Sequence, residues 1–180
     1  MAVLIEGISV VIRVDAIKSR YPGGWEAFKA NAPNATCCSD RELVRVGFMA
    51  PRDARDFVKS LEDLGLIYLE GGTARDMVAV DQLKGPAAPC ETIECGYMFL
   101  EDDPERRVLV ARLNGSKQEL VYTPDDWMFE TSLTRSFGYV PEEKRDKSLT
   151  FLRHENGLDV YLNAVTGTEV FVGRTGRVVG

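Results

Sequence analysis

Histidine and long apolar runs are both scarce in this sequence, and each shortage excludes classes of protein. His154 is the only histidine among 180 residues. The chain therefore lacks the ligands for a zinc protease with paired helical histidines, or for an iron or copper site built from several imidazoles. No apolar run approaches the roughly 20 residues of a membrane helix, and neither end carries a lipidation motif. We expect a cytoplasmic protein without a membrane partner.

Basic residues are also in short supply. Lys and Arg number 22 against 28 Asp and Glu, which gives a formal net charge of -6. Because nucleic-acid binders need clustered basic side chains, we do not expect a nucleic-acid partner. Solubility explains the acidic balance most simply, and a basic protein partner is the alternative explanation.

Cysteine occurs four times, as the adjacent Cys37 and Cys38 and as Cys90 and Cys95. Adjacent ligands strain a tetrahedral zinc site, and neither pair has the two-residue gap of common zinc knuckles. Reduced thiols packed as small apolar side chains are the favoured interpretation in a cytoplasmic protein, while redox or nucleophilic work is the alternative. No cofactor is expected.

The N-terminal half carries clear secondary-structure patterns. Residues 8–14 alternate between apolar and polar side chains, which is typical of a half-buried strand rather than a signal peptide. Residues 51–64 place one apolar stripe opposite a charged face, which predicts an amphipathic helix that begins at Pro51 and ends before Gly65. Further strands are predicted at 42–49, 66–69 and 76–81, and short helical pieces at 15–20 and 25–30. The resulting β-α-β-α-β order is compatible with a ferredoxin-like arrangement.

A linker-like stretch, residues 85–89, divides the chain near its middle. We expect an N-terminal α/β subdomain at 1–84 and a β-rich subdomain at 90–180, packed as one compact α+β unit. The second half is mostly antiparallel and rich in hairpins, with strands predicted at 97–100, 106–113 and 118–122. One helix is predicted to begin at 123–126 and to bury Phe129, Leu133 and Phe137.

The last segment predicts a three-stranded meander at 149–155, 158–163 and 168–174. A two-residue turn at Asn156-Gly157 fixes the register of its first hairpin. The predicted cross-strand pairs are Glu155 with Leu158, His154 with Asp159, Arg153 with Val160, and Leu152 with Tyr161.

His154 and Asp159 are the candidate catalytic residues. An aspartate opposite the histidine could orient the imidazole in a Ser-His-Asp arrangement. An exposed cross-strand pair is nevertheless the favoured interpretation, because such pairs are common beside hairpin turns. In either case the carboxylate would raise the pKa of the imidazole.

Acidic and aromatic clusters give the candidate partner surface. No alternating Asp/Asn pattern supports calcium binding, and solvated turns and a helix start explain the acidic groups well. If these groups converge in space, they form an acidic face suited to a basic protein. The candidate surface residues are Tyr21, Trp25, Glu101, Asp102, Asp103, Asp125 and Asp126.

Three functional hypotheses follow from the sequence. The favoured one is a non-enzymatic interaction or regulatory protein that binds a basic partner through an acidic face. The second is a small-ligand-binding module with a cleft between the two halves. The third is an enzyme that uses His154 or a cysteine. Homo-oligomer formation is left open.

Overall fold

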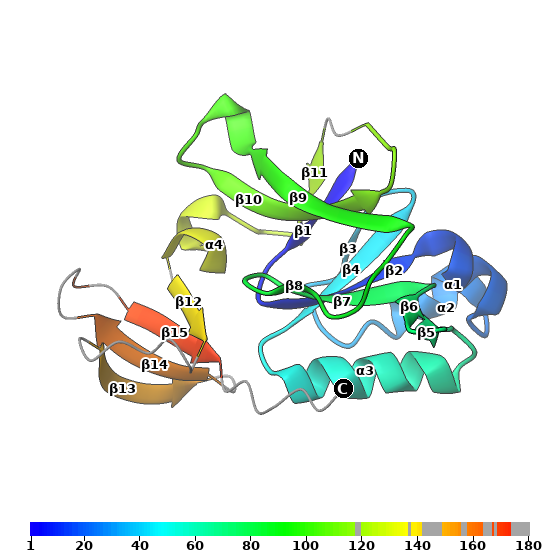
Figure 1. Ribbon diagram of the computed structural model, residues 1–180, viewed down its shortest axis with the longest axis horizontal. Helices are drawn as coiled ribbons and strands as arrows, with labels where there is room; N and C mark the ends of the chain where they lie inside the picture. Colours follow the sequence, from blue (N-terminus) through cyan, green and yellow to red (C-terminus); the bar gives the residue numbers. More distant parts are fainter. Residues whose placement is uncertain are drawn as a thin grey trace.

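The computed structural model describes residues 1–117, 120–136, 138–141, 149–155, 158–163, 167 and 169–173. Within this part of the chain, three larger β-sheets combine with four α-helices (Figure 1), so the predicted α+β class is confirmed. Across the same residues, no helix has the length and apolar character needed to span a membrane.

The β2 sheet is five-stranded and antiparallel, in the order β3-β4-β2-β7-β8. The central strand, β2, pairs antiparallel with β4 on one side and with β7 on the other. Its alternating side chains are buried on both faces, because helices cover one face and a second sheet covers the other. The strands are β2 (Ile8–Arg13), β3 (Cys38–Ser39), β4 (Leu43–Phe48), β7 (Met77–Asp81) and β8 (Gly85–Pro86).

Three helices cover one face of the β2 sheet: α1 (Val14–Arg20), α2 (Gly24–Ala30) and α3 (Pro51–Asp63). The amphipathic helix predicted from the sequence is confirmed as α3, whose Ala54, Val58 and Leu61 are buried against the strands. Pro51 is its first residue, and Gly65, just past its end, has the positive φ of 108° that glycine adopts at low cost.

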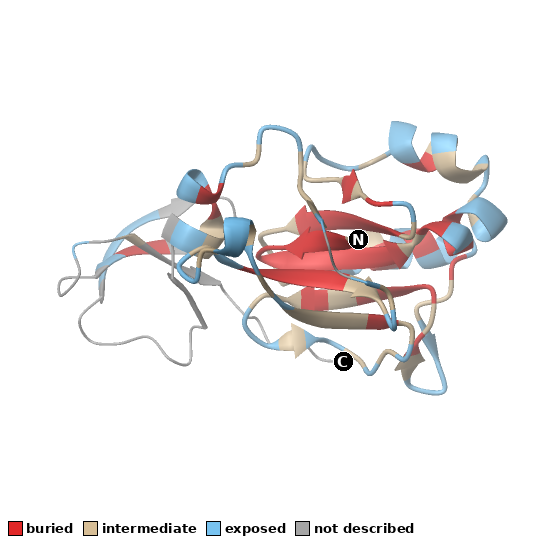
Figure 2. Ribbon diagram, turned by 90° about the horizontal axis from the view of Figure 1, so that it is seen from above, coloured by how far each residue is buried: buried red, intermediate tan, exposed pale blue. Residues whose placement is uncertain are grey.

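The β1 sheet packs on the opposite face of the β2 sheet, in the order β11-β1-β10-β9. Val3 and Ile5 of β1 meet Val11 and Val78 of the β2 sheet in the core between them. Figure 2 shows the buried residues gathered in these stacked strands. The strands are β1 (Ala2–Ile5), β9 (Ile93–Phe99), β10 (Arg107–Leu113) and β11 (Val121–Tyr122).

Gly7 joins the two sheets. The sequence predicted one N-terminal strand from residue 8, whereas the structure has two consecutive strands, β1 and β2, in different sheets. Gly7 turns the chain between them at a φ of 57°, and a Cβ on it would lie 2.9 Å from the carbonyl oxygen of Phe48. A side chain is therefore excluded at this corner by both conformation and space.

The ferredoxin-like pattern is not confirmed. β4, α3 and β7 do place two parallel strands on either side of β2. The strand predicted at 66–69 is wrong in position, because it is absent from the β2 sheet. The chain instead forms a small ribbon of β5 (Leu69–Glu70) and β6 (Thr73–Ala74).

The helix predicted to begin at 123–126 is wrong. Asp126 has a positive φ of 59°, which cannot continue an α-helix, and the chain turns there. Short helical turns follow as η2 (Phe129–Thr131) and α4 (Leu133–Ser136). Phe129 is buried as expected, because it packs with Trp127 on the outer face of the β1 sheet. Phe137 lies outside the described residues.

The C-terminal sheet confirms the predicted meander, in the order β12-β15-β14-β13. The predicted pairs Glu155 with Leu158, His154 with Asp159 and Arg153 with Val160 are all present. The fourth pair is wrong: a bulge at Leu152 places Phe151, not Leu152, opposite Tyr161. The strands are β12 (Gly138–Pro141), β13 (Leu149–Glu155), β14 (Leu158–Asn163) and β15 (Glu169–Gly173).

Strand pairing crosses the joint expected at residues 85–89. β1, from the first half, pairs antiparallel with β10 and parallel with β11, both from the second half. The β1 sheet is thus built from both halves of the chain. The division into subdomains 1–84 and 90–180 stays a prediction.

Candidate functional site

One long edge of the β1 sheet, strand β9, has no second neighbouring strand within the described part of the chain. Among the residues that the structure describes, β9 pairs only with β10. The backbone bonds from Leu100 N to Arg106 O (3.0 Å) and from Asn114 N to Thr92 O (2.9 Å) fix which residues face the partner strand. In an antiparallel pair these are alternate residues, so the even-numbered residues of β9 bond to β10.

The odd-numbered residues of β9 therefore point their backbone N–H and C=O groups away from β10. Side chains alternate along the same strand. Ile93 is buried at 3% exposure, whereas Tyr97 and Phe99 are 57% and 52% exposed. The guanidinium of Arg107 lies over the ring of Tyr97 at 4.3 Å. The edge thus runs from a buried end to an exposed aromatic end. The outward residues are Ile93, Cys95, Tyr97 and Phe99.

An open groove of about 520 Å³ lies beside the first half of β9. Ile93, Glu94 and Cys95 of β9 form one wall of the groove, and residues 86–90 form the other. Two backbone bonds hold that wall in place: Ala87 N donates to Ala79 O at 2.8 Å, and Ala74 N donates to Pro89 O at 2.7 Å. The groove is mainly apolar and adjoins the free edge.

An acidic turn, residues 101–105, connects β9 to β10 through η1 (Leu100–Asp102). Glu101 and Asp102 have positive φ values of 54° and 57°, which non-glycine residues adopt at a cost of about 1 kcal/mol each. The turn is closed by Asp103 N donating to Leu100 O and by Arg106 N donating to Asp103 O, both at 3.0 Å. Most of its carboxylates are therefore held at the exposed tip of the hairpin.

Arg106 draws a further carboxylate to this turn. Its guanidinium pairs with Glu101 through Nη1 and with Glu130 Oε1 through Nη2, the latter at 3.1 Å. The same group lies 5.3 Å from the centre of the Phe129 ring. We call the resulting group of carboxylates the acidic patch; Asp103 is half-buried and the others are exposed. Its members are Glu101, Asp102, Asp103, Glu105 and Glu130.

Glu130 was missed by sequence reasoning, because 24 residues separate it from Arg106. The segment that carries it is anchored by Glu6 at the corner between β1 and β2. The Glu6 carboxylate accepts bonds from Trp127 Nε1 at 3.1 Å and from the Thr134 backbone N at 3.1 Å. This buried carboxylate fixes the segment from both sides of Glu130.

The structure brings only part of the predicted partner surface together. Glu101, Asp102 and Asp103 share the hairpin tip, whereas no hydrogen bond or ion pair among the described residues joins Asp125 or Asp126 to it. The latter two are exposed in the turn before Trp127.

Tyr21 follows α1 and Trp25 belongs to α2, and these two helices lie at the other end of the stacked sheets from the β9–β10 hairpin (Figure 1). Both aromatic side chains are half-buried against Phe28 of α2, with ring centres 5.5 and 5.9 Å from it. They complete the helix-side core and are not part of the acidic patch.

The cysteine pairs are separate, and all four thiols are free. Burial raises the pKa of both Cys38 and Cys95 to about 11, and it also raises the pKa of Cys37. Thiols with a raised pKa stay protonated near neutral pH, which makes them poor nucleophiles and poor metal ligands. Within the described residues, no group of three or more His, Cys, Asp or Glu side chains could hold a metal ion.

A buried arginine lies between the two stacked sheets. Arg45 donates from Nε to Ser9 Oγ at 2.9 Å, from Nη1 to Thr36 O at 3.1 Å and from Nη2 to Glu6 O at 3.0 Å. Burial lowers the pKa of Arg45, yet an arginine stays charged in proteins. These bonds to backbone and hydroxyl oxygens tie β4 to the Gly7 corner, which is a structural role.

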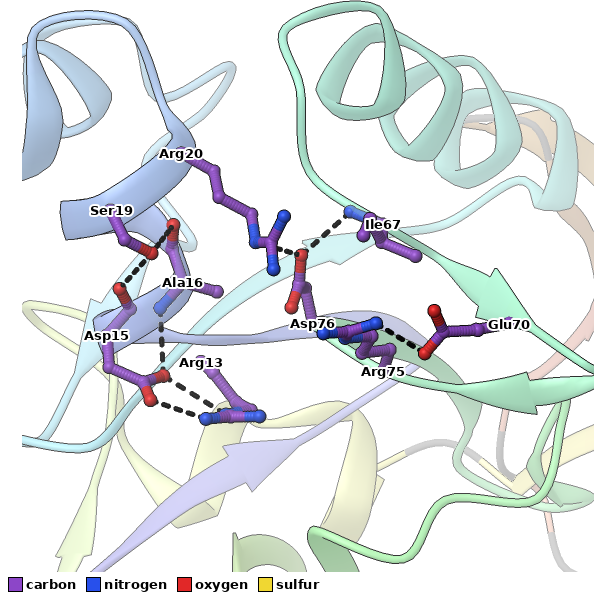
Figure 3. A network of polar contacts seen from close by, with 9 residues as sticks. All are labelled: Arg13, Asp15, Ala16, Ser19, Arg20, Ile67, Glu70, Arg75 and Asp76. Carbon is purple, nitrogen blue, oxygen red and sulfur yellow. Dashed lines mark hydrogen bonds and ion pairs between the residues drawn. The ribbon is translucent and has the colours of Figure 1, made fainter.

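A second polar network ties α1 to the loop before β5 (Figure 3). The buried carboxylate of Asp76 accepts a bond from the Ile67 backbone N at 2.8 Å and pairs with Arg20 Nε at 3.2 Å. Arg75 pairs with Glu70 nearby. Each of these carboxylates has a cationic partner, so the network stabilises the fold and leaves no acid poised for chemistry.

The catalytic candidates His154 and Asp159 are opposite one another in the backbone register of β13 and β14. Their side chains lie outside the described residues, so a catalytic role and the raised imidazole pKa stay predictions.

In comparisons with known proteins, no family model, no curated protein and no solved structure matches the chain.

Proposed function

We propose that the protein is a non-enzymatic interaction or regulatory module that binds a basic protein through the acidic patch. The observation that carries the proposal is the link made by Arg106, which gathers the turn at 101–105 and Glu130 at one exposed hairpin tip. Among the described residues, five carboxylates there outnumber the three guanidinium groups beside them, which belong to Arg106, Arg107 and Arg135.

Charge of this kind favours a basic partner in two ways. The net charge of -6 attracts a basic protein over distances of about a Debye length, roughly 8 Å at physiological salt. The patch then sets orientation and association rate, because complementary exposed charges act mainly on those properties. The same charge disfavours nucleic acid.

Other features of the chain support the same proposal. Three of the four thiols have a raised pKa, which argues against a cysteine enzyme. Free thiols also suit a cytoplasmic location, where disulfides are rare.

A small-ligand-binding module is the second candidate. The groove beside β9, at about 520 Å³, falls in the range of roughly 300–1,000 Å³ that small-molecule sites occupy. It is open to solvent and lies between residues 86–90 and β9. A fragment screen by NMR tests it: shifts confined to Ile93, Glu94 and Cys95 would favour this candidate.

A charge-reversal experiment tests the main proposal. The Asp102→Lys/Glu105→Lys double variant changes two exposed carboxylates of the patch, and its matched control, Asp125→Lys/Asp126→Lys, makes the same net-charge change outside it. Binding is measured on an array of short basic, neutral and acidic peptides. We expect wild type and control to bind basic peptides and the double variant to bind them about tenfold more weakly. Equal losses in both variants would show that net charge alone matters and would overturn the proposed patch.

A further inference from the structure

We propose that the basic partner contributes an extended segment that adds to the free edge of β9 as a new antiparallel strand. This inference rests on the proposed function and specifies how the partner binds. Strand addition to an exposed sheet edge is a recurring mode of peptide recognition, in which backbone hydrogen bonds supply affinity and side-chain contacts supply specificity.

The backbone of β9 supplies the hydrogen bonds. Ile93, Cys95, Tyr97 and Phe99 direct N–H and C=O groups outward, and no described residue pairs with them there. The strand is seven residues long, so a bound segment of equal length would span roughly 23 Å. Pairing antiparallel, the commoner arrangement, lets each outward residue exchange two bonds with the segment.

The other sheet edges are blocked by features that proteins commonly use against strand addition. In the β2 sheet, the edge strands β3 and β8 have two residues each, and β8 ends in Pro86. The other edge of the β1 sheet, β11, is equally short. In the C-terminal sheet, edge strand β13 carries a bulge after Phe151, and the other edge, β12, is four residues long and ends in Pro141. The strands of the β5–β6 ribbon have two residues each. None of these features interrupts β9, whose one charged residue, Glu94, is neutralised by Arg112 on β10.

The surroundings of the edge define the chemistry of the segment. An antiparallel segment begins beside the end of β9, so its N-terminal residues lie next to the acidic turn at 101–105. Its middle meets the exposed rings of Tyr97 and Phe99, and its C-terminal residues reach the apolar groove beside Ile93. The fitting sequence therefore starts with Lys or Arg and continues with alternating β-branched residues.

Charge also decides against a second copy of this chain on the edge. Two antiparallel copies of β9 would pair Cys95 of one with Tyr97 of the other, so that outward residues meet. Beyond the ends of the two strands, this arrangement directs the acidic turn at 101–105 of one copy towards Glu91 of the other, and like charges disfavour that approach. A basic segment of a different protein avoids this repulsion.

The test uses a fluorescent probe peptide, Lys-Arg-Lys-Val-Thr-Val-Thr-Val, and measures binding by anisotropy. Two further versions each carry two backbone N-methyl groups, one version on the first two valines and the other on the two threonines. Composition is matched, but each version removes the N–H groups of only one edge of the peptide strand. We expect one version to bind about tenfold more weakly than the other, because it loses two hydrogen bonds to β9.

Variants of the protein test the same hydrogen bonds by changing β9 instead of the peptide. Tyr97→Pro removes one outward N–H and leaves the β10 ladder intact, whereas Tyr97→Ala removes the ring and keeps the N–H. We expect the proline variant to lose about tenfold more affinity than the alanine variant. Thermal unfolding checks that both variants fold. If the proline variant does not fold, the comparison of the two methylated peptides tests the proposal.

The outcomes separate the two proposals. Equal binding of both methylated peptides, together with loss of binding in Asp102→Lys/Glu105→Lys, would overturn strand addition and keep the acidic patch. Absence of wild-type binding to basic peptides of any design would overturn the proposed function itself. A dimer seen by sedimentation that Tyr97→Pro abolishes would assign the edge to a second copy and overturn the basic segment.

Discussion

The β2 sheet and the β1 sheet share a core but differ in how completely they are covered. The β2 sheet is buried on both faces, and its outermost strands are two residues long. The β1 sheet has a seven-residue strand at its edge, with exposed aromatic side chains and a strained acidic turn at its end. Burial stabilises the first region, while the second exposes charged side chains and backbone groups that no described residue pairs with. This contrast distinguishes β9 from the covered strands as a surface on which a partner could bind.

The largest effect is expected in the core under the β2 sheet. Leu61 of α3 is buried at 1% exposure, so Leu61→Ala should lower the free energy of unfolding by about 2–5 kcal/mol through lost burial and a residual cavity. Leu64, one turn later and 40% exposed, is the matched control. Chemical denaturation measures both. A similar loss in Leu64→Ala would contradict the division between covered and exposed positions.

A smaller, pH-dependent effect is expected at Cys38, which lies between the two sheets. Burial raises its pKa from 9.0 to about 11, so the folded state holds the proton more tightly than the unfolded state. This contribution to stability is complete below pH 9 and is lost as pH rises towards 11. We expect wild type to lose about 1–3 kcal/mol more than Cys38→Ala over that window.

Denaturant unfolding of the two proteins at several pH values provides the measurement. Cys38→Ala keeps the other titrating groups, so its own loss of stability at high pH sets the reference. Parallel stability curves for the two proteins would show that the Cys38 thiol is not buried as described.

Local patterns predicted the elements that local interactions specify. The 3.6-residue stripe from Ala54 to Leu61, with Pro51 and Gly65 at its ends, was sufficient for α3. The Asn-Gly turn was sufficient for most of the β13–β14 register. The register failed only past the bulge at Leu152, because a bulge is set by packing that alternation does not encode.

The candidate site depended on contacts that no local pattern encodes. β1 pairs with β10 more than 100 residues away, with Val3 opposite Ala111. Whether β9 is an edge strand depends on how all the strands of the β1 sheet are ordered, so the sequence of β9 alone does not predict it. The helix start at Thr123-Pro124 was plausible locally, but burial of Trp127 and Phe129 on the β1 sheet prevailed.

The smallest effect is expected at the acidic turn, where strain and charge coincide. Asp102 has a φ of 57°, so Asp102→Gly should relieve strain and raise the free energy of unfolding by about 0.5–1 kcal/mol. Asp103, in extended conformation at a φ of -89°, is the matched control. Asp103→Gly makes the same charge change but should destabilise the fold, because it adds unfolded-state entropy and removes the bond that Asp103 Oδ1 accepts from Glu105 N.

Thermal unfolding and basic-peptide binding together sharpen the contrast between the two sheets. Both glycine variants should bind basic peptides about two- to fivefold more weakly, since each removes one carboxylate from the patch. The expected result is that Asp102→Gly is more stable than wild type, that Asp103→Gly is less stable, and that both bind basic peptides more weakly. This result would mean that the turn keeps a strained aspartate at position 102 for binding, although glycine would be more stable there. A destabilised Asp102→Gly with unchanged binding would contradict both the strain and the role assigned to the patch.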